Sequence, residues 1–275
     1  MKCRIRDLDL NYEVAGAGRP VLVLHGGAIG NAKMAMAAIE PLFEGRAGWR
    51  RYYPDMPGHG DTPTPEWLHG HDDLLDTMVR FSEAVVPAGD RWVVIGWSWG
   101  GYVARGFIHH RLPLIDGVML YVPKMQWGGG GEPPAAIRHD SSYDAALRPG
   151  EEWMAGVLAV QTAALLEEMR THIARHARPV DPAASAALDA GLFSFDPDLL
   201  SARSPAPALI LTARQDAVEG YRQAWQVLDN FPRGTYAVLD RAGHALGLEQ
   251  PALFRALGGE WLDRVEEYVG KEAHE

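Results

Sequence analysis

Short apolar runs alternate with longer amphipathic segments over the first 123 residues. Buried strands are predicted at residues 21–24, 49–53, 92–96 and 117–122, and helices between them near 32–44, 68–86 and 100–111. Strands that are apolar throughout and separated by helices indicate a mostly parallel sheet covered on both faces. Residues 3–14 alternate apolar and polar positions, which favours an additional antiparallel hairpin.

This alternation stops at residue 124. Residues 124–203 contain no convincing buried strand; they begin with a flexible stretch at Gly128–Gly131 and continue into predicted helices at 151–175 and after Pro182. The alternation resumes with strands at 208–212 and 236–239 and helices near 219–230 and 251–269. We therefore expect an α/β core of residues 1–123 and 204–275, with 124–203 inserted as a helical cap over the ligand crevice.

The segment Gly96-Trp97-Ser98-Trp99-Gly100 matches the nucleophile-elbow pattern. The bare pattern arises easily by chance, and a serine in a glycine-rich structural turn is the alternative. Its position makes it specific, because the serine directly follows a predicted strand and precedes a predicted helix. A turn this tight exposes the hydroxyl at the edge of the sheet, and small flanking residues relieve the crowding. Ser98 is therefore the predicted nucleophile.

A serine nucleophile needs a base and an acid that orients the base. In this arrangement the acid and then the histidine follow later in the chain, each just past a strand. Asp216 lies five residues after the strand at 208–211, and His244 lies five residues after the strand at 236–239. Glu219 and Asp240 compete for the role of the acid. The spacing favours Asp216, because four extended residues would separate Asp240 from His244 by about 13 Å, and Glu219 is expected to begin a helix.

Stabilising the developing oxyanion requires two backbone N–H groups. One is expected from Trp99, the residue after the nucleophile. The other is expected from the loop after the strand at 21–24, where we assign Gly27, with Ala28 as the second choice. His25 is expected to brace that loop.

Composition and charge narrow the class of protein. The chain has 275 residues, is 47% hydrophobic and has a net charge of −10, which excludes a disordered chain and argues against nucleic-acid binding. Its single cysteine, Cys3, can form no internal disulfide. No apolar run is long enough to suggest a signal peptide or a membrane span. We expect a cytoplasmic protein that acts on a small molecule, with monomer and homodimer both open.

Two further groups of residues have ordinary explanations. A metal site could be built from the cluster His69, His71, Asp72 and Asp73, but helix capping explains those residues better. An apolar acyl pocket could be lined by Trp97, Trp99, Trp127 and Trp153, with core or lid packing equally open.

Together these motifs resemble the α/β-hydrolase superfamily. The resemblance is carried by His25-Gly26-Gly27, the loop Asp55-Met56-Pro57-Gly58-His59-Gly60-Asp61-Thr62, residues 96–101, Asp216 and Ala242-Gly243-His244. It implies an eight-stranded, mainly parallel sheet, a helical cap, and a Ser-His-Asp mechanism that uses no cofactor and no metal.

Departures from individual branches narrow the expected reaction. Ser98 stands where haloalkane dehalogenases and epoxide hydrolases have aspartate, which disfavours both reactions. The loops at Ala28-Ile29 and Asp55–Gly58 depart from those of proline iminopeptidases. The elbow looks like that of carrier-protein methyl ester esterases. We therefore predict hydrolysis of a small, largely apolar ester or related acyl compound. Carbon–carbon bond hydrolysis or a cofactor-free lyase reaction is the enzymatic alternative, and a hydrolase-derived ligand receptor is the non-enzymatic one.

Overall fold

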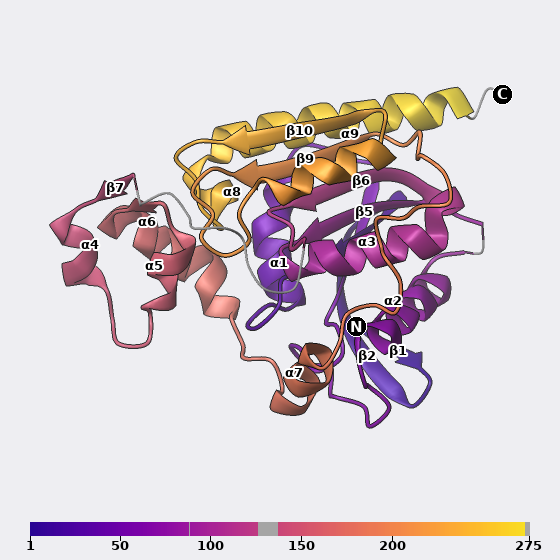
Figure 1. Cartoon of the computed structure of the whole chain (residues 1–275), viewed down its shortest axis with the longest axis horizontal. Coiled ribbons are helices and arrows are strands. Elements are labelled where there is room, and N and C mark those ends of the chain that lie inside the picture. The colour runs from indigo at the N-terminus through magenta and orange to yellow at the C-terminus, as the bar shows by residue number, and fades with distance from the viewer. Residues whose placement is uncertain (88, 126–136, 273–275) are drawn as a thin grey trace.

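A single eight-stranded sheet forms the centre of the computed structural model, which describes residues 1–87, 89–125 and 137–272 (Figure 1). The strands are β1 (Lys2–Ile5), β2 (Leu8–Gly16), β3 (Arg19–Leu24), β4 (Trp49–Pro54), β5 (Trp92–Trp97), β6 (Ile115–Tyr121), β9 (Ala208–Ala213) and β10 (Gly234–Leu239). Their order is β1-β2-β4-β3-β5-β6-β9-β10. β2 is antiparallel to both of its neighbours, and the pairs from β4 to β10 are parallel. The expected hairpin and mostly parallel sheet are confirmed.

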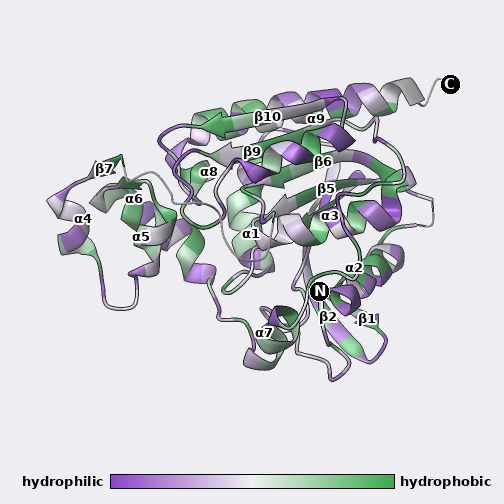
Figure 2. Ribbon diagram, in the orientation of Figure 1, coloured by the Kyte–Doolittle hydropathy of each residue, from purple (hydrophilic) through white to green (hydrophobic). Residues whose placement is uncertain are grey.

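Helices cover both faces of this sheet. The larger ones are α1 (Ala32–Ile39), α2 (His71–Val85), α3 (Trp99–Arg111) and α9 (Pro251–Glu272). Shorter ones are η1 (Glu40–Leu42), η2 (Leu112–Leu114), η5 (Gln223–Asn230) and α8 (Leu246–Glu249). Core contacts place α2, α3 and η5 on one face, and α1 and α9 on the other. Hydrophobic and hydrophilic residues alternate along α9, as expected for a helix with one buried side (Figure 2).

The strands contribute alternate residues to two separate cores. Leu22 and Leu24 of β3 pack with the α2 and α3 side, whereas Val21 and Val23 pack with the α1 and α9 side. Successive side chains of a strand point to opposite faces, so a strand covered on both faces must be apolar at every position. This explains the continuous apolar runs in the sequence.

Between β6 and β9 the described chain forms short elements rather than long helices. They are β7 (Arg138–His139), α4 (Ser141–Ala146), α5 (Trp153–Val157), β8 (Val160–Gln161), α6 (Ala163–Glu168), the π-helical turn η3 (Met169–Ile173), η4 (Ala174–His176) and α7 (Pro182–Asp189). β7 and β8 form a separate two-stranded parallel sheet. Gly128–Gly131, where the sequence indicated flexibility, and Trp127 lie outside the described residues.

Two helix predictions were wrong in extent. The predicted helix at 151–175 is interrupted at Leu158–Thr162, because the chain there turns extended and bonds to distant residues: the Ala159 N–H donates to Glu249. The predicted helix at 219–230 is replaced by the 3₁₀-helix η5. Its start is displaced because the side chain of Asp216 accepts the Val218 and Glu219 N–H groups, and Gly220 adopts φ +71°.

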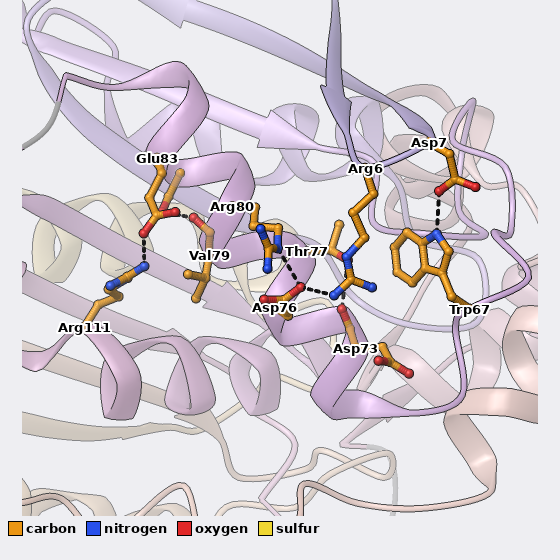
Figure 3. A network of polar contacts seen from close by, with 11 residues as sticks. Arg6, Asp7, Trp67, Asp73, Asp76, Thr77, Val79, Arg80, Glu83 and Arg111 are labelled. Carbon is orange, nitrogen blue, oxygen red and sulfur yellow. Dashed lines mark hydrogen bonds and ion pairs between the residues drawn. The ribbon is translucent and has the colours of Figure 1, made fainter.

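A surface network holds α2 against the N-terminal hairpin and α3 (Figure 3). Asp76 on α2 pairs with Arg6 at 2.5 Å and with Arg80 at 2.8 Å, and Glu83 pairs with Arg111 of α3. These side chains are partly exposed, and exposed pairs contribute about 0–1 kcal/mol each. The network therefore orients elements at the surface and adds little to stability.

The carboxyl ends of the parallel strands meet at one edge of the sheet. Strands β9 and β10 point toward the side on which α4, α5 and α6 lie (Figure 1). Ser98 directly follows β5, Asp216 follows β9, and His244 follows β10. The three predicted catalytic residues thus come to the same edge of the sheet from separate parts of the chain.

Candidate active site

Ser98 occupies a strained turn between β5 and α3. Its backbone has φ 55° and ψ −123°, a conformation that costs a non-glycine residue about 1–3 kcal/mol. A Cβ on Gly96 would lie 2.6 Å from the Gly100 carbonyl oxygen, and one on Gly100 would lie 2.1 Å from that of Leu24. Both positions therefore require glycine. The Ser98 N–H donates to Tyr121 at 3.0 Å, and this bond helps to hold the turn in place.

The structure brings Ser98, His244 and Asp216 into one hydrogen-bonded chain. Ser98 Oγ lies 2.9 Å from His244 Nε2, and His244 Nδ1 lies 2.9 Å from Asp216 Oδ2. All three residues are buried, with exposed fractions of 9% or less. Since the carboxylate accepts, the ring hydrogen belongs on Nδ1, which leaves Nε2 to accept from the serine hydroxyl. This is the arrangement that a serine nucleophile and a general base require.

Opposing effects act on the pKa of His244. Burial lowers it, but the charge and hydrogen bond of Asp216 raise it, with a further contribution from Glu219, so that the pKa lies above its usual value. The other oxygen of Asp216 accepts the N–H groups of Val218 at 2.8 Å and Glu219 at 3.0 Å. The carboxylate is therefore held in place from both sides.

The two competing carboxylates lie elsewhere. Asp240 accepts from Gln215 Nε2 at 2.8 Å, and that hydrogen bond lowers its pKa. Glu219 is buried beside Lys124, with 3.7 Å between Oε1 and Nζ. Of the three acids weighed from the sequence, Asp216 is the one hydrogen-bonded to His244.

The two predicted oxyanion donors lie close together beside Ser98. A Cβ on Gly27 would be 3.2 Å from Cβ of Trp99, and one on Gly26 would be 3.4 Å from Cβ of Ser98. Within the described ranges, no acceptor is hydrogen-bonded to the backbone N–H of Gly27 or Trp99. Ala28, the second choice, adopts φ +57° and accepts the Val180 N–H.

Three buried histidines surround the Trp99 side chain, an arrangement that the sequence did not reveal. The Trp99 indole N–H donates to His71 Nε2 at 3.0 Å, and His71 Nδ1 lies 2.7 Å from the Gly191 carbonyl oxygen. The His59 ring stacks on the indole at 5.1 Å, and His25 lies beside both. Burial lowers the pKa of all three, to about 4 for His25 and about 3 for His59. They are neutral supports for Trp99 rather than bases.

The expected bracing role of His25 agrees with its contacts. Its Nε2 accepts the Met56 N–H at 3.1 Å, which joins the loop after β3 to the loop after β4. Asp55 completes that junction, accepting from the Ala32 N–H at 2.7 Å and the Asp61 N–H at 2.9 Å. The Asp55–Thr62 motif thus has a structural part in positioning the site.

A cavity of about 1040 Å³ opens over Ser98. Core residues that line it include Gly27, Trp97, Ser98, Trp99, Tyr121 and His244. Residues from the chain between β6 and β9 line it as well, among them Trp153, Val157, Met169, Ile173 and Leu188. Large, mostly apolar pockets with a few convergent polar groups are typical of small-molecule sites. Trp97, Trp99 and Trp153 all line this cavity, as expected if these tryptophans form an apolar acyl pocket.

A metal site finds no support among the described residues. No group of three or more histidine, cysteine, aspartate or glutamate side chains is placed there to hold a metal ion. In the cluster at 69–73, His71 faces Trp99, whereas Asp73 accepts the His69 N–H. Over the same described ranges, no helix combines the length and apolarity needed to cross a membrane.

Comparison with known proteins places this geometry among hydrolases. A family model described as "Alpha/beta hydrolase family" matches residues 21–257. The chain is 24% identical over 270 residues to 2-hydroxy-6-oxo-6-(2'-aminophenyl)hexa-2,4-dienoic acid hydrolase of Metapseudomonas resinovorans, covering 90% of this chain and 85% of that protein.

Solved structures share the fold at low sequence identity. An alpha/beta superfamily hydrolase from Oenococcus oeni PSU-1 matches with a TM-score of 0.80 and 21% identity, covering 94% of this chain and 96% of that one. A thermophilic esterase from Thermogutta terrifontis matches with a TM-score of 0.70 and 22% identity, covering 96% and 97%.

Proposed function

The chain belongs to the alpha/beta hydrolase family, and on that basis we propose that it is a serine hydrolase of small, largely apolar esters or related acyl compounds. The observation that carries the proposal is the Ser98–His244–Asp216 chain, with 2.9 Å at each link, at the base of a large pocket. The apolar and aromatic lining favours an apolar substrate.

The geometry supports a two-step acyl transfer. Ser98 Oγ attacks the substrate carbonyl while His244 Nε2 takes its proton, and Asp216 stabilises the resulting imidazolium. The backbone N–H groups of Gly27 and Trp99 stabilise the oxyanion. His244 then returns the proton to the departing alkoxide, which leaves as the alcohol. In the second step His244 deprotonates a water molecule that attacks the acyl-enzyme, and the carboxylic acid is released as Ser98 regains its proton.

Residues 124–203 act in this proposal as a cap over the site, inserted between core segments 1–123 and 204–275. The support is that α5, η3 and α7 all contribute residues to the lining of the pocket that Ser98 also lines. A cap of this kind excludes water and selects substrates by shape. The physiological ligand in this proposal is a small molecule.

Carbon–carbon bond hydrolysis is the second candidate. It is favoured by the similarity to the aminophenyl hexadienoic acid hydrolase, which is named for a keto acid rather than an ester. The same Ser98–His244–Asp216 chain would serve that reaction. A panel that contains p-nitrophenyl esters and a 2-hydroxy-6-oxo-dienoate separates the two candidates by relative kcat/KM.

The direct test is covalent labelling. A fluorophosphonate probe is expected to modify the peptide that contains Ser98 in a one-to-one ratio and to abolish turnover of short p-nitrophenyl esters. Ser98→Ala is expected to lose both labelling and turnover. Labelling at another residue, or full activity in Ser98→Ala, would refute the proposal.

A further inference from the structure

Two glutamates near His244, Glu249 and Glu219, differ in how many hydrogen-bond donors their carboxylate oxygens contact. Glu249 accepts three backbone N–H groups, from Gly243, Ala159 and Val160. The Glu219 carboxylate, by contrast, has a single polar partner among the described residues, the ammonium group of Lys124 at 3.7 Å. Only 8% of the Glu219 side chain is exposed. Burying a carboxylate is costly unless its oxygens are satisfied, so a structural role does not account for Glu219.

The Lys124–Glu219 pair lies at the catalytic end of the pocket. Both residues line the cavity together with Ser98 and His244. The Lys124 N–H donates to the Ser98 carbonyl oxygen at 2.9 Å, and the Glu219 N–H donates to Asp216 Oδ1 at 3.0 Å. The two charges also act on His244, whose pKa Glu219 raises and Lys124 lowers. The backbones of the pair are therefore bonded directly to two residues of the catalytic chain.

The chemistry of the pair selects one kind of ligand group. Lys124 offers N–H donors and Glu219 offers acceptor oxygens, and together they carry no net charge. Glu219 would repel a carboxylate on the substrate, and Lys124 would repel an ammonium group. A hydroxyl group complements both, because its oxygen accepts from Lys124 while its hydrogen is donated to Glu219.

We propose that the Lys124–Glu219 pair binds a hydroxyl group on the substrate, so that the preferred substrates are hydroxylated rather than purely aliphatic esters. This inference rests on the proposed function and adds a polar requirement to a pocket that is otherwise largely apolar. An analogue that lacks the hydroxyl leaves the buried Glu219 carboxylate without a second hydrogen-bond donor, which makes the pair a determinant of specificity.

The experiment compares esters in which a terminal hydroxyl replaces a methyl group. Methyl 6-hydroxyhexanoate and methyl heptanoate test the acyl arm, and 5-hydroxypentyl acetate and hexyl acetate test the alcohol arm, with acid release followed by pH-stat titration. We expect the hydroxylated ester to have a kcat/KM about tenfold higher on one of the two arms. It should also exceed the charged analogues monomethyl adipate and methyl 6-aminohexanoate.

Two variants link that preference to the pair. Lys124→Met and Glu219→Gln are each expected to bring the hydroxyl-to-methyl ratio close to one. Because the measure is a ratio of two kcat/KM values, a loss of activity common to both substrates cancels. If Lys124→Met does not fold, the isosteric variant Glu219→Gln still tests the pair. The exposed Lys33→Met and Glu260→Gln, outside the pocket lining, serve as matched controls and should keep the wild-type ratio.

The outcomes separate this inference from the proposed function. The hydroxyl site would be overturned if the wild-type enzyme showed a hydroxyl-to-methyl ratio of kcat/KM near one for both the acyl and the alcohol series. A preference for a charged analogue would overturn it as well. If turnover still depended on Ser98, the serine hydrolase proposal would stand. Absence of Ser98-dependent turnover on every ester would instead refute the proposed function and this inference with it.

Discussion

The pocket has two walls that are built differently. On the core wall, Ser98 and His244 follow sheet strands, and hydrogen bonds join their side chains to each other and to the buried Asp216. On the opposite wall, Trp153, Met169 and Leu188 come from α5, η3 and α7, which are five, five and eight residues long. Met169 and Leu188 are held by apolar packing.

In the proposed function the two walls have different tasks, and the difference in construction fits them. Proton transfer requires atoms placed to a few tenths of an ångström, and strand ends in a covered sheet provide that rigidity. Substrate shape is selected by apolar contacts, which tolerate repacking. We therefore expect changes on the core wall to act on kcat, and changes on the opposite wall to act on KM.

Glu249 of α8 joins the two walls. Its oxygens accept the Gly243 N–H beside His244 and the Ala159 and Val160 N–H groups of the chain between β6 and β9, the latter two at 2.7 and 2.8 Å. The Ala245 N–H adds a bond to the Val157 carbonyl oxygen at 3.1 Å. The histidine loop is thus attached directly to the chain between β6 and β9.

The largest effect is expected in Asp216→Asn, which changes the hydrogen-bond partner of His244 on the core wall. The amide keeps the shape but cannot stabilise the imidazolium, so kcat should fall by about 10⁴. Steady-state kinetics with p-nitrophenyl acetate measures this. Asp240→Asn is the matched control and should stay within about tenfold of the wild type, because Asp240 bonds to Gln215 away from the histidine. The reverse ranking of the two variants would move the acid to a different strand.

Glu249→Gln tests the junction between the walls. The amide NH₂ cannot accept, so at least one buried N–H loses its partner, which costs about 1–3 kcal/mol. We expect a lower Tm and a kcat/KM reduced by about tenfold, measured by thermal unfolding and steady-state kinetics. The exposed Glu260→Gln on α9 controls for the same chemical change. A Glu249→Gln variant equal to Glu260→Gln in both measurements would show that the walls are independent.

The pH profile distinguishes His244 from the histidines around Trp99. His244 must be neutral to take a proton, and Asp216 raises its pKa, so kcat/KM should fall on acidification with a midpoint above the usual histidine pKa. His25, His59 and His71 have lowered pKa values, so their titration should not contribute to the fall in kcat/KM at that pH. In Asp216→Asn the residual activity should show its midpoint shifted to lower pH. If the midpoint in Asp216→Asn were unshifted, the fall in kcat/KM on acidification would have to come from a group other than His244.

The smallest effect is expected on the opposite wall, in Trp153→Ala. Losing this apolar contact should raise KM several-fold for long-chain p-nitrophenyl esters and less for the acetate, with kcat little changed. Trp225→Ala removes an equally large exposed side chain outside the pocket lining and should change neither constant. Equal effects of the two variants on KM, or a KM that is unchanged at every chain length, would contradict a substrate-contacting wall.

Local patterns predicted the sheet well and the helices less evenly. The apolar run before Ser98 and the glycines around it are adjacent in sequence, so the elbow could be recognised without the fold. Leu158–Thr162 carried no comparable signal, because its extended conformation follows from the hydrogen bonds of Ala159 and Val160 to Glu249, far along the chain. The start of η5 was missed because the Asp216 side chain holds the preceding turn.

The sequence by itself determined the order of the sheet strands along the chain and the positions of Ser98, Asp216 and His244 after strand ends. These features depend on residues within a few positions of one another. Only the tertiary structure decided that His71 accepts the Trp99 indole N–H, that Lys124 meets Glu219, and that Glu249 joins the two walls. Such contacts join residues far apart in the chain, and they depend on how every intervening element packs.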